Sequence, residues 1–242
     1  MLPPPKYLAL ANRLIAALPE DSRAYFLERC ELVSLQRQDV LTKSGQLAEH
    51  AYFPIDSFVA AVMKLDDSGD VQVDLTGNEG MVNVSLVLGS PVSSLTNTVQ
   101  GAGRAFRIHH IQLKDLLETD LFLRDILNLY IGLRIDQLAR NMACASYHTV
   151  EQRLARWLLM ARDRAHSNEL LLTHELLALM LGVRRESVTQ AASALQKLEL
   201  ISYSRGDLLL LDQAGLEAAS CGCYRRDLAM YERAMTHATE QD

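Results

Sequence analysis

The chain has 242 residues, of which 49% are hydrophobic and 22% charged, and its net charge at pH 7 is −6. At about 100–200 residues per domain, this length fits one large domain or two smaller ones, and the composition excludes disordered and collagen-like chains. The acidic total argues against a protein that coats nucleic acid by bulk electrostatics. It leaves one mildly basic segment, residues 148–206, with eight Lys and Arg against six Asp and Glu.

The first twenty residues predict a helix rather than a membrane or export signal. Apolar residues recur at helical spacing from Leu8 to Leu18, and Lys6, Asn12 and Arg13 interrupt them. No apolar run in the chain approaches the roughly 18 residues of a transmembrane helix, and the layout of a secretory signal is missing. We therefore expect a cytoplasmic protein with no membrane partner.

From about residue 31 to 108 the pattern changes to short alternating runs separated by turn residues. Val71–Leu75, for example, alternates apolar and polar side chains with period two, as a half-buried strand does. The predicted strands are Glu31–Leu35, Tyr52–Phe53, Ser57–Leu65, Val71–Leu75, Leu95–Gln100 and Arg104–Ile108. Many short strands at this spacing predict an antiparallel sandwich or jelly roll.

Residues 119–147 predict one long helix, because the apolar period returns to 3.6 and proline is missing from this stretch. One apolar stripe runs through the candidate dimerisation residues Leu127, Ile131, Leu138 and Met142. A second stripe contains Ile126, Leu129 and Leu133. A helix of about 28 residues spans about 42 Å, longer than a small sandwich covers, which favours a homodimer. The alternative is a helix buried on both faces within one chain.

A capping box at Thr149 and Gln152 predicts a new helix that runs to about Arg164. Further on, Thr173 can cap a short helix that ends at Gly182, and a second helix follows from about Arg184 to Leu198. Two helices joined by a three- to four-residue turn with a glycine form a helix-turn-helix. Ala178 and Val188, on either side of Gly182, have the small and apolar side chains that the crossing of the two helices needs.

The second helix leaves polar side chains on its open face, where they suit recognition of base edges. Arg pairs bidentately with guanine, Gln with adenine, and Glu accepts from cytosine. A hairpin follows at once, with Ser204 and Arg205 at its tip in reach of phosphate. The candidate DNA-binding residues are Thr173, Arg184, Arg185, Glu186, Thr189, Gln190, Ser193, Ser204 and Arg205. Beyond the hairpin, the residues from Gln213 to about Thr239 predict one further helix, which Asp212 can cap. We expect this helix to pack on the winged domain, that is, on the domain formed by the helix-turn-helix and the hairpin.

The order of β-roll, long helix and winged helix-turn-helix resembles the Crp/Fnr family of transcription regulators over nearly the whole chain. The more specific match runs from Leu172-Thr173 to Gly182 and on to Arg185-Glu186 and Val188. The resemblance implies an α+β homodimer with a sensor β-roll (residues 1–118), a dimerisation helix (119–147) and a winged helix-turn-helix domain (148–242). It also implies that Thr173 contacts phosphate and that Arg185 and Glu186 read bases. Gln190 stands where the nucleotide-dependent activators commonly have Arg.

The sensor half departs from the family's cyclic-nucleotide cassette, which supplies a Gly-Glu pair for the ribose and an Arg-Ser pair for the cyclic phosphate. The corresponding effector-pocket candidates are Gly77, Glu79, Gly80, Ser93, Ser94 and, on the long helix, Leu138. No Arg stands between Ser93 and Arg104, so a bound phosphate would lose its strongest bidentate partner. These departures argue against cAMP binding in the family's usual manner.

The four cysteines, Cys30, Cys144, Cys221 and Cys223, are too few and too scattered for a disulfide framework. Cys221-Gly-Cys223 could start a zinc site, but no second close pair of cysteines appears, so we expect ordinary thiols and no metal. The cysteine cluster that the oxygen-sensing branch of the Crp/Fnr family carries is missing too. We therefore expect no iron–sulfur cluster and no other cofactor. Catalytic motifs such as HExxH, GxSxG and a phosphate loop are missing, so we expect no enzyme.

The sequence thus favours a DNA-binding transcription regulator that acts as a homodimer on palindromic operators. Its expected partners are double-stranded DNA, a second copy of the chain, a small-molecule effector of unknown identity and, if it is an activator, RNA polymerase. The alternative is a small-molecule sensor whose winged domain binds another protein. That alternative predicts no salt-dependent binding to duplex DNA.

Overall fold

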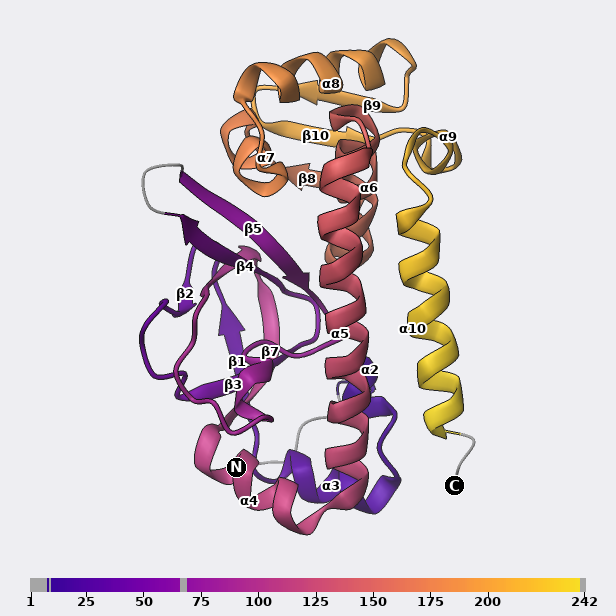
Figure 1. Cartoon of the computed structure of the whole chain (residues 1–242). Helices are drawn as coiled ribbons and strands as arrows, with labels where there is room; N and C mark the ends of the chain where they lie inside the picture. The colour runs from indigo at the N-terminus through magenta and orange to yellow at the C-terminus, as the bar shows by residue number, and fades with distance from the viewer. Residues whose placement is uncertain (1–7, 9, 66–68, 240–242) are drawn as a thin grey trace.

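The computed structural model describes residues 8, 10–65 and 69–239. A β-roll, a long central helix and a winged domain follow one another along the chain (Figure 1). The winged domain lies at one end of the central helix, and the β-roll lies along its side. The predicted α+β architecture is therefore confirmed.

The β-roll contains two antiparallel sheets, ordered β1–β7–β3 and β2–β6–β4–β5. Small and apolar side chains such as Val59, Val99 and Ala105 fill the space between the sheets. The strands are β1 (Glu31–Leu35), β2 (Val40–Thr42), β3 (His50–Pro54), β4 (Phe58–Leu65), β5 (Gly69–Thr76), β6 (Thr96–Gly101) and β7 (Gly103–His109). Each predicted strand is present, and β2, of only three residues, was not predicted.

Short helices close one end of the roll: α2 (Arg13–Ala16), α3 (Glu20–Leu27) and α4 (His110–Thr119). The predicted single helix over residues 8–18 is interrupted: Leu8 has helical backbone, residues 10–12 form a turn, residue 9 lies outside the described residues, and α2 begins at Arg13. Asn12 explains this start, since its side-chain oxygen accepts from the backbone N–H groups of Leu14 and Ile15. Its amide nitrogen also donates to the carbonyl oxygens of Pro54 and Gly80, each at 2.9 Å. The cap thereby ties the helix to the roll.

The central helix α5 (Leu121–Tyr147) begins at Asp120, whose carboxylate accepts from the Leu123 N–H at 3.0 Å. Its start agrees closely with the predicted helix of residues 119–147. Thr149 then forms the predicted capping box with Gln152 and starts α6 (Val150–Ala165). A hinge of His148 and Thr149, both with extended backbone, therefore separates α5 from α6.

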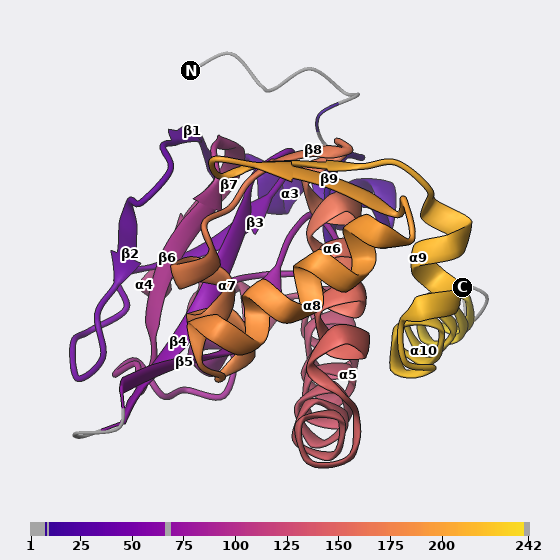
Figure 2. The same ribbon diagram turned by 90° about the horizontal axis from the view of Figure 1, so that it is seen from above.

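The winged domain continues with β8 (Glu169–Leu171), α7 (His174–Leu181), α8 (Arg185–Lys197), β9 (Ile201–Ser204) and β10 (Asp207–Leu210). Its strands form one antiparallel sheet in the order β8–β10–β9. The predicted hairpin is confirmed as β9 and β10, and β8 adds a strand that was not predicted. The domain rests on the β4–β5 hairpin (Figure 2), and Ala60, Val62 and Leu75 join its hydrophobic core.

The C-terminal segment forms two helices, α9 (Gln213–Ala219) and α10 (Cys223–Thr239), so the prediction of one helix is wrong. Asp212 caps α9 as predicted, but the chain turns extended at Ser220 and α10 starts in a new direction. The predicted packing on the winged domain holds for the start of α10, where Tyr224 joins the core of that domain, and the helix then runs back beside α5 towards the β-roll (Figure 1). There Glu232 pairs with Arg13 at 2.9 Å.

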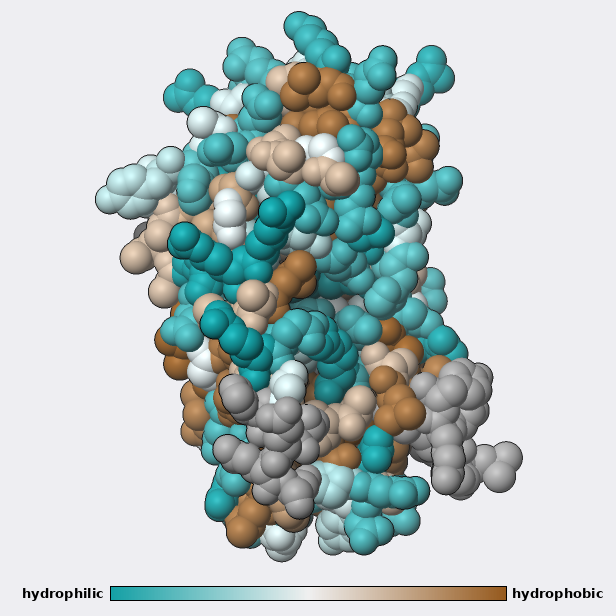
Figure 3. All heavy atoms as spheres, turned by 90° about the vertical axis from the view of Figure 1, so that its right-hand side faces the viewer, coloured by the Kyte–Doolittle hydropathy of each residue, from teal (hydrophilic) through white to brown (hydrophobic). Residues whose placement is uncertain are grey.

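The side of the molecule that carries α10 is mostly hydrophilic, with small separate hydrophobic patches (Figure 3). The helix buries its other face, where Tyr224 and Met235 are 4% and 7% exposed. Among the described residues, none of the helices combines the length and the apolar character needed to cross a membrane.

Candidate nucleic-acid interface

The two helices α7 and α8 meet at the predicted glycine turn. The Thr173 hydroxyl accepts from the Leu176 N–H at 3.1 Å and starts α7. Gly182 ends it with a left-handed backbone, φ +61°, which favours glycine. Val188 is fully buried and Ala191 nearly so, and together they pack α8 against the domain core. The turn and this apolar contact fix how α8 projects from the domain.

The outer face of α8 is solvent-exposed along its length. The exposed side chains on it and just before it include Arg184, Arg185, Glu186, Thr189, Gln190 and Ser193. The sequence analysis predicted each of them as a DNA contact, and the structure brings them together on one surface.

A small network links α7, α8 and the wing at the edge of this surface. Arg185 pairs with Glu175 of α7 at 3.0 Å, and both side chains are about 60% exposed. The Thr189 hydroxyl lies 3.0 Å from Nδ1 of His174. The His174 ring stacks on Tyr203 of β9, with 4.5 Å between ring centroids and 10° between planes. The exposed face of α8 is thus supported from behind by the first helix and the wing.

The wing turn places its tip beside the same surface. Arg205 and Gly206 both have positive φ, 51° and 95°, the backbone of a tight hairpin turn that matches strand twist. Ser204 and Arg205 are exposed, and the exposed Thr173 lies near Gly206. The Tyr203 hydroxyl donates to the Leu172 carbonyl at 3.0 Å and ties the wing to the start of α7.

This geometry agrees with the comparison to known families. The family described as the Crp-like helix-turn-helix domain matches residues 152–219. Residues 152–219 are a Crp-like helix-turn-helix domain. The match extends from α6 through the wing to α9, so it includes both helices of the turn and every predicted DNA-binding residue.

The similarity in fold to solved Crp/Fnr regulators extends beyond this domain over most of the chain. A transcriptional regulator of the Crp/Fnr family from Eubacterium rectale has a TM-score of 0.67 at 18% identity, and the match covers 88% of this chain and 97% of that one. FixK2 from Bradyrhizobium japonicum has a TM-score of 0.67 at 16% identity, over 80% of this chain and 98% of its own.

A third similar structure is the c-di-GMP-responsive global regulator CLP of Xanthomonas campestris, with a TM-score of 0.65 at 16% identity, over 80% and 100% of the two chains. At these identities the likeness shows the fold. Among curated proteins, none matches this sequence. The predicted resemblance to the Crp/Fnr family is thus confirmed by the helix-turn-helix domain and by the arrangement of β-roll, long helix and winged domain.

The predicted effector-pocket residues fall into separate places. Gly77, Glu79 and Gly80 lie in one turn, packed against α5 and α6: a Cβ on Gly80 would stand 1.9 Å from the Tyr130 hydroxyl. Ser93 and Ser94 lie in another loop, where the Ser93 carbonyl accepts from the Gly45 N–H at 2.7 Å. Leu138 is 43% exposed on α5. The structure therefore does not gather the six candidates into one pocket.

Buried ion pairs occupy the contact between the roll and the long helices. Arg134 of α5 pairs with Asp74 of β5, and the Arg134 side chain is 6% exposed. Arg164 of α6 pairs with Glu79 at 2.6 Å and donates to the Leu75 carbonyl at 3.1 Å. A cavity of about 390 Å³ lies beside these ion pairs, between α5, α6 and α10. Of the six candidate residues for an effector pocket, Glu79 lines this cavity.

The predicted dimerisation stripe divides in two. Leu127 is fully buried and Ile131 is 8% exposed, so within their own chain they already pack against its interior. These two side chains therefore leave no surface for a partner chain. The prediction that they take part in dimerisation is wrong. Leu138 and Met142, at 43% and 72% exposure, do face solvent, and Ile135, which was not predicted, joins them at 62%. The helix turns its first half into the β-roll core and exposes apolar side chains in its second half.

One group of residues was missed by the sequence analysis. The structure brings Cys144 and His148 of the α5 end to Cys221 and Cys223 at the α9–α10 junction. The prediction of no metal rested on the lack of a second close cysteine pair, but the second pair is a cysteine and a histidine four residues apart. That spacing places both side chains on one face of a helix, and it was the signal available.

Proposed function

We propose that this protein is a DNA-binding transcription regulator that reads its operator with α8. One observation carries the proposal: six predicted contact residues lie exposed on α8 and just before it, beside a wing tip with its own arginine. Arg185, Glu186 and Gln190 have the donors and acceptors that distinguish base pairs in the major groove. Thr173, Ser204 and Arg205 suit phosphate, which fixes position without reading sequence.

The proposed active form is a homodimer. Ile135, Leu138 and Met142 give α5 an exposed apolar face, and exposed apolar residues at helical spacing suit a helix-to-helix contact with a second copy. A two-fold dimer would present two α8 helices. Successive major grooves on one face of DNA lie about 34–36 Å apart, so the operator would be an imperfect palindrome.

Regulation by a small molecule would act through the contact between roll and winged domain. The Arg164–Glu79 pair joins the winged domain to the roll, and the Arg134–Asp74 pair joins α5 to the roll. A ligand that separates either pair would change how the roll holds the helices that carry the winged domain. The effector and its pocket stay unassigned in this proposal. If the protein is an activator, RNA polymerase is a further partner.

The test is selection of bound sites from a random duplex library with purified full-length protein. A two-fold symmetric motif with half-sites about one helical turn apart is the expected result. The affinity for the selected site should also fall steeply as salt rises, because phosphate contacts release counterions. Absence of any enriched motif and of any salt-dependent duplex binding would contradict the proposal and favour the alternative, a sensor whose winged domain binds protein.

A further inference from the structure

Four metal-ligating side chains from distant parts of the sequence meet at the hinge between α5 and α6. This Cys₃His cluster consists of Cys144, His148, Cys221 and Cys223. Its four ligand atoms, three sulfurs and one ring nitrogen, all lie within 4.8 Å of one another. The three cysteines are 2–7% exposed and form a cluster of their own, apart from the aliphatic cores.

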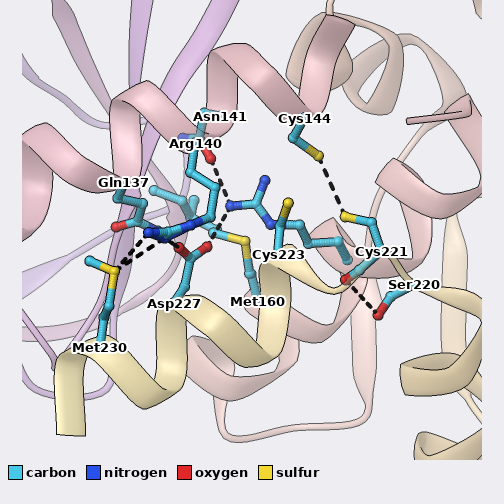
Figure 4. Close-up of polar contacts among 12 residues, drawn as sticks. Gln137, Arg140, Asn141, Cys144, Met160, Ser220, Cys221, Cys223, Asp227 and Met230 are labelled. Atoms are coloured by element: carbon cyan, nitrogen blue, oxygen red, sulfur yellow. Dashed lines mark hydrogen bonds and ion pairs between the residues drawn. The ribbon is translucent and has the colours of Figure 1, made fainter. Parts of the chain in front are cut away.

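The spacing of the ligand atoms fits a single metal ion. The sulfurs of Cys144 and Cys221 lie 3.5 Å apart, and the Cys223 sulfur lies 3.8 Å from Nδ1 of His148 (Figure 4 shows the three cysteines). Zinc–sulfur bonds of about 2.3 Å in a tetrahedron place ligand atoms about 3.8 Å apart. A disulfide needs about 2.05 Å between sulfurs, well short of the distance here. An iron–sulfur cluster needs ligands that are further apart, because several ions must fit between them.

Local structure explains why the ligands converge. His148 directly follows α5, and its backbone N–H donates to the Cys144 carbonyl at 3.1 Å, which holds it one turn beyond Cys144. Cys221 and Cys223 flank Gly222 in the break between α9 and α10. The break that the sequence analysis did not predict thus turns both sulfurs towards the end of α5.

The surroundings also suit a negatively charged metal centre. Three thiolates and a neutral imidazole around Zn²⁺ leave a net charge of −1. Arg156 of α6 lies beside Cys144 and is 6% exposed. Asp227 and Asn141 fix that guanidinium through hydrogen bonds of 2.6 and 2.7 Å. Groups of this kind around a metal orient its ligands and tune its charge.

From these contacts we propose that the Cys₃His cluster binds one Zn²⁺ ion as a structural site. Four protein ligands complete a tetrahedron and leave no open position for a substrate, which is the arrangement of structural rather than catalytic zinc. The ion joins the end of α5 to the α9–α10 junction across the hinge. Zinc thereby fixes the direction in which the winged domain leaves the long helix. The proposal does not depend on DNA binding by α8.

The experiment measures metal in the full-length protein, purified without chelator, by inductively coupled plasma mass spectrometry. About one zinc ion per chain is expected. Cys221→Ser should lose the zinc, whereas Cys30→Ser should keep it. Cys30 is the matched control because it is a buried free cysteine in the N-terminal core, outside the cluster.

A second measurement covers the case in which Cys221→Ser fails to fold. Wild-type protein stripped of metal is titrated with Co²⁺, which should give sulfur-to-cobalt charge-transfer and tetrahedral d–d absorption that saturate at about one equivalent. Wild-type protein with neither bound zinc nor cobalt absorption would overturn the proposal. So would bound iron with the visible absorption of an iron–sulfur cluster, or a Cys144–Cys221 disulfide found by mass spectrometry.

Discussion

Arg164 of the winged domain forms an ion pair with Glu79 of the β-roll, with 2.6 Å between Nη2 and Oε1. The two side chains are 10% and 16% exposed, so water screens the pair only weakly. The residues are far apart in the sequence and belong to different modules. The pair therefore helps to fix the position of the winged domain relative to the β-roll. A substitution at Glu79 tests this role without changing any residue on the exposed face of α8.

Glu79→Gln should destabilise the protein by about 3–5 kcal/mol, because it leaves the Arg164 guanidinium buried without its counter-charge. Chemical denaturation of the variant and the wild type measures the loss. Glu118→Gln is the control, since Lys114 and Glu118 form a pair at 4.0 Å that is 75% and 66% exposed. An exposed pair of this kind contributes about 0–1 kcal/mol. Equal stability of the two variants would contradict a structural role for the Arg164–Glu79 pair.

Arg185→Ala should weaken binding to the selected operator by about 1–3 kcal/mol, which is about 5- to 150-fold, with a smaller loss on random duplex. The reason is that a base contact is made only on the correct sequence. Fluorescence anisotropy on both duplexes measures the effect. Arg226→Ala, which removes an exposed arginine on α10 instead, should leave the ratio between the two duplexes unchanged. An equal loss on both duplexes would assign Arg185 to phosphate.

Ile135→Asp should convert the dimer to a monomer, since it places a charge on the exposed apolar face of α5. The side chain is 62% exposed, so the fold of the chain should tolerate the change. Light scattering coupled to size exclusion would then give the mass of one chain rather than two. Leu88→Asp, at an equally exposed leucine of the β-roll (66%), should stay dimeric. A dimeric Ile135→Asp protein would place the interface elsewhere.

The winged domain should lose stability below about pH 6.5 through His174. Burial lowers the pKa of His174, and the positive charge of Arg185 lowers it further, below the ordinary value of 6.5. Because the unfolded chain then binds the proton more readily, this contribution to stability is complete above pH 6.5 and is lost as the pH falls. His174→Gln should flatten the fall in Tm from about pH 7 to 5.5. An unchanged slope would contradict this origin.

Patterns within a short stretch of sequence sufficed to predict the helix-turn-helix and the exposed face of α8. Thr173, Gly182 and Val188 lie within sixteen residues, and each acts through its neighbours, as a cap, a turn or a packing contact. The capping box at Thr149 is local in the same way. The strands that were missed, β2 and β8, have three residues each, too few for a periodic pattern to show.

Features that depend on distant parts of the chain could not be predicted. The partner of Glu79 is 85 residues away, and Cys144 is 77 residues from Cys221. The burial of Leu127 depends on the β-roll that packs against it, because apolar spacing alone does not say whether a stripe faces its own chain or a partner. The break at Ser220–Gly222 lacks proline, so the continuing helical pattern concealed it.

The course of α10 bears on how the molecule unfolds. At one end its Tyr224 hydroxyl donates to Asp163 of α6 at 2.8 Å. Midway along the helix the Tyr231 hydroxyl donates to the Glu79 carbonyl of the roll at 2.6 Å. Neither module can therefore melt without releasing a helix that the other also uses. Calorimetry should show a single cooperative transition for the full chain, and removal of α10 should split it into two.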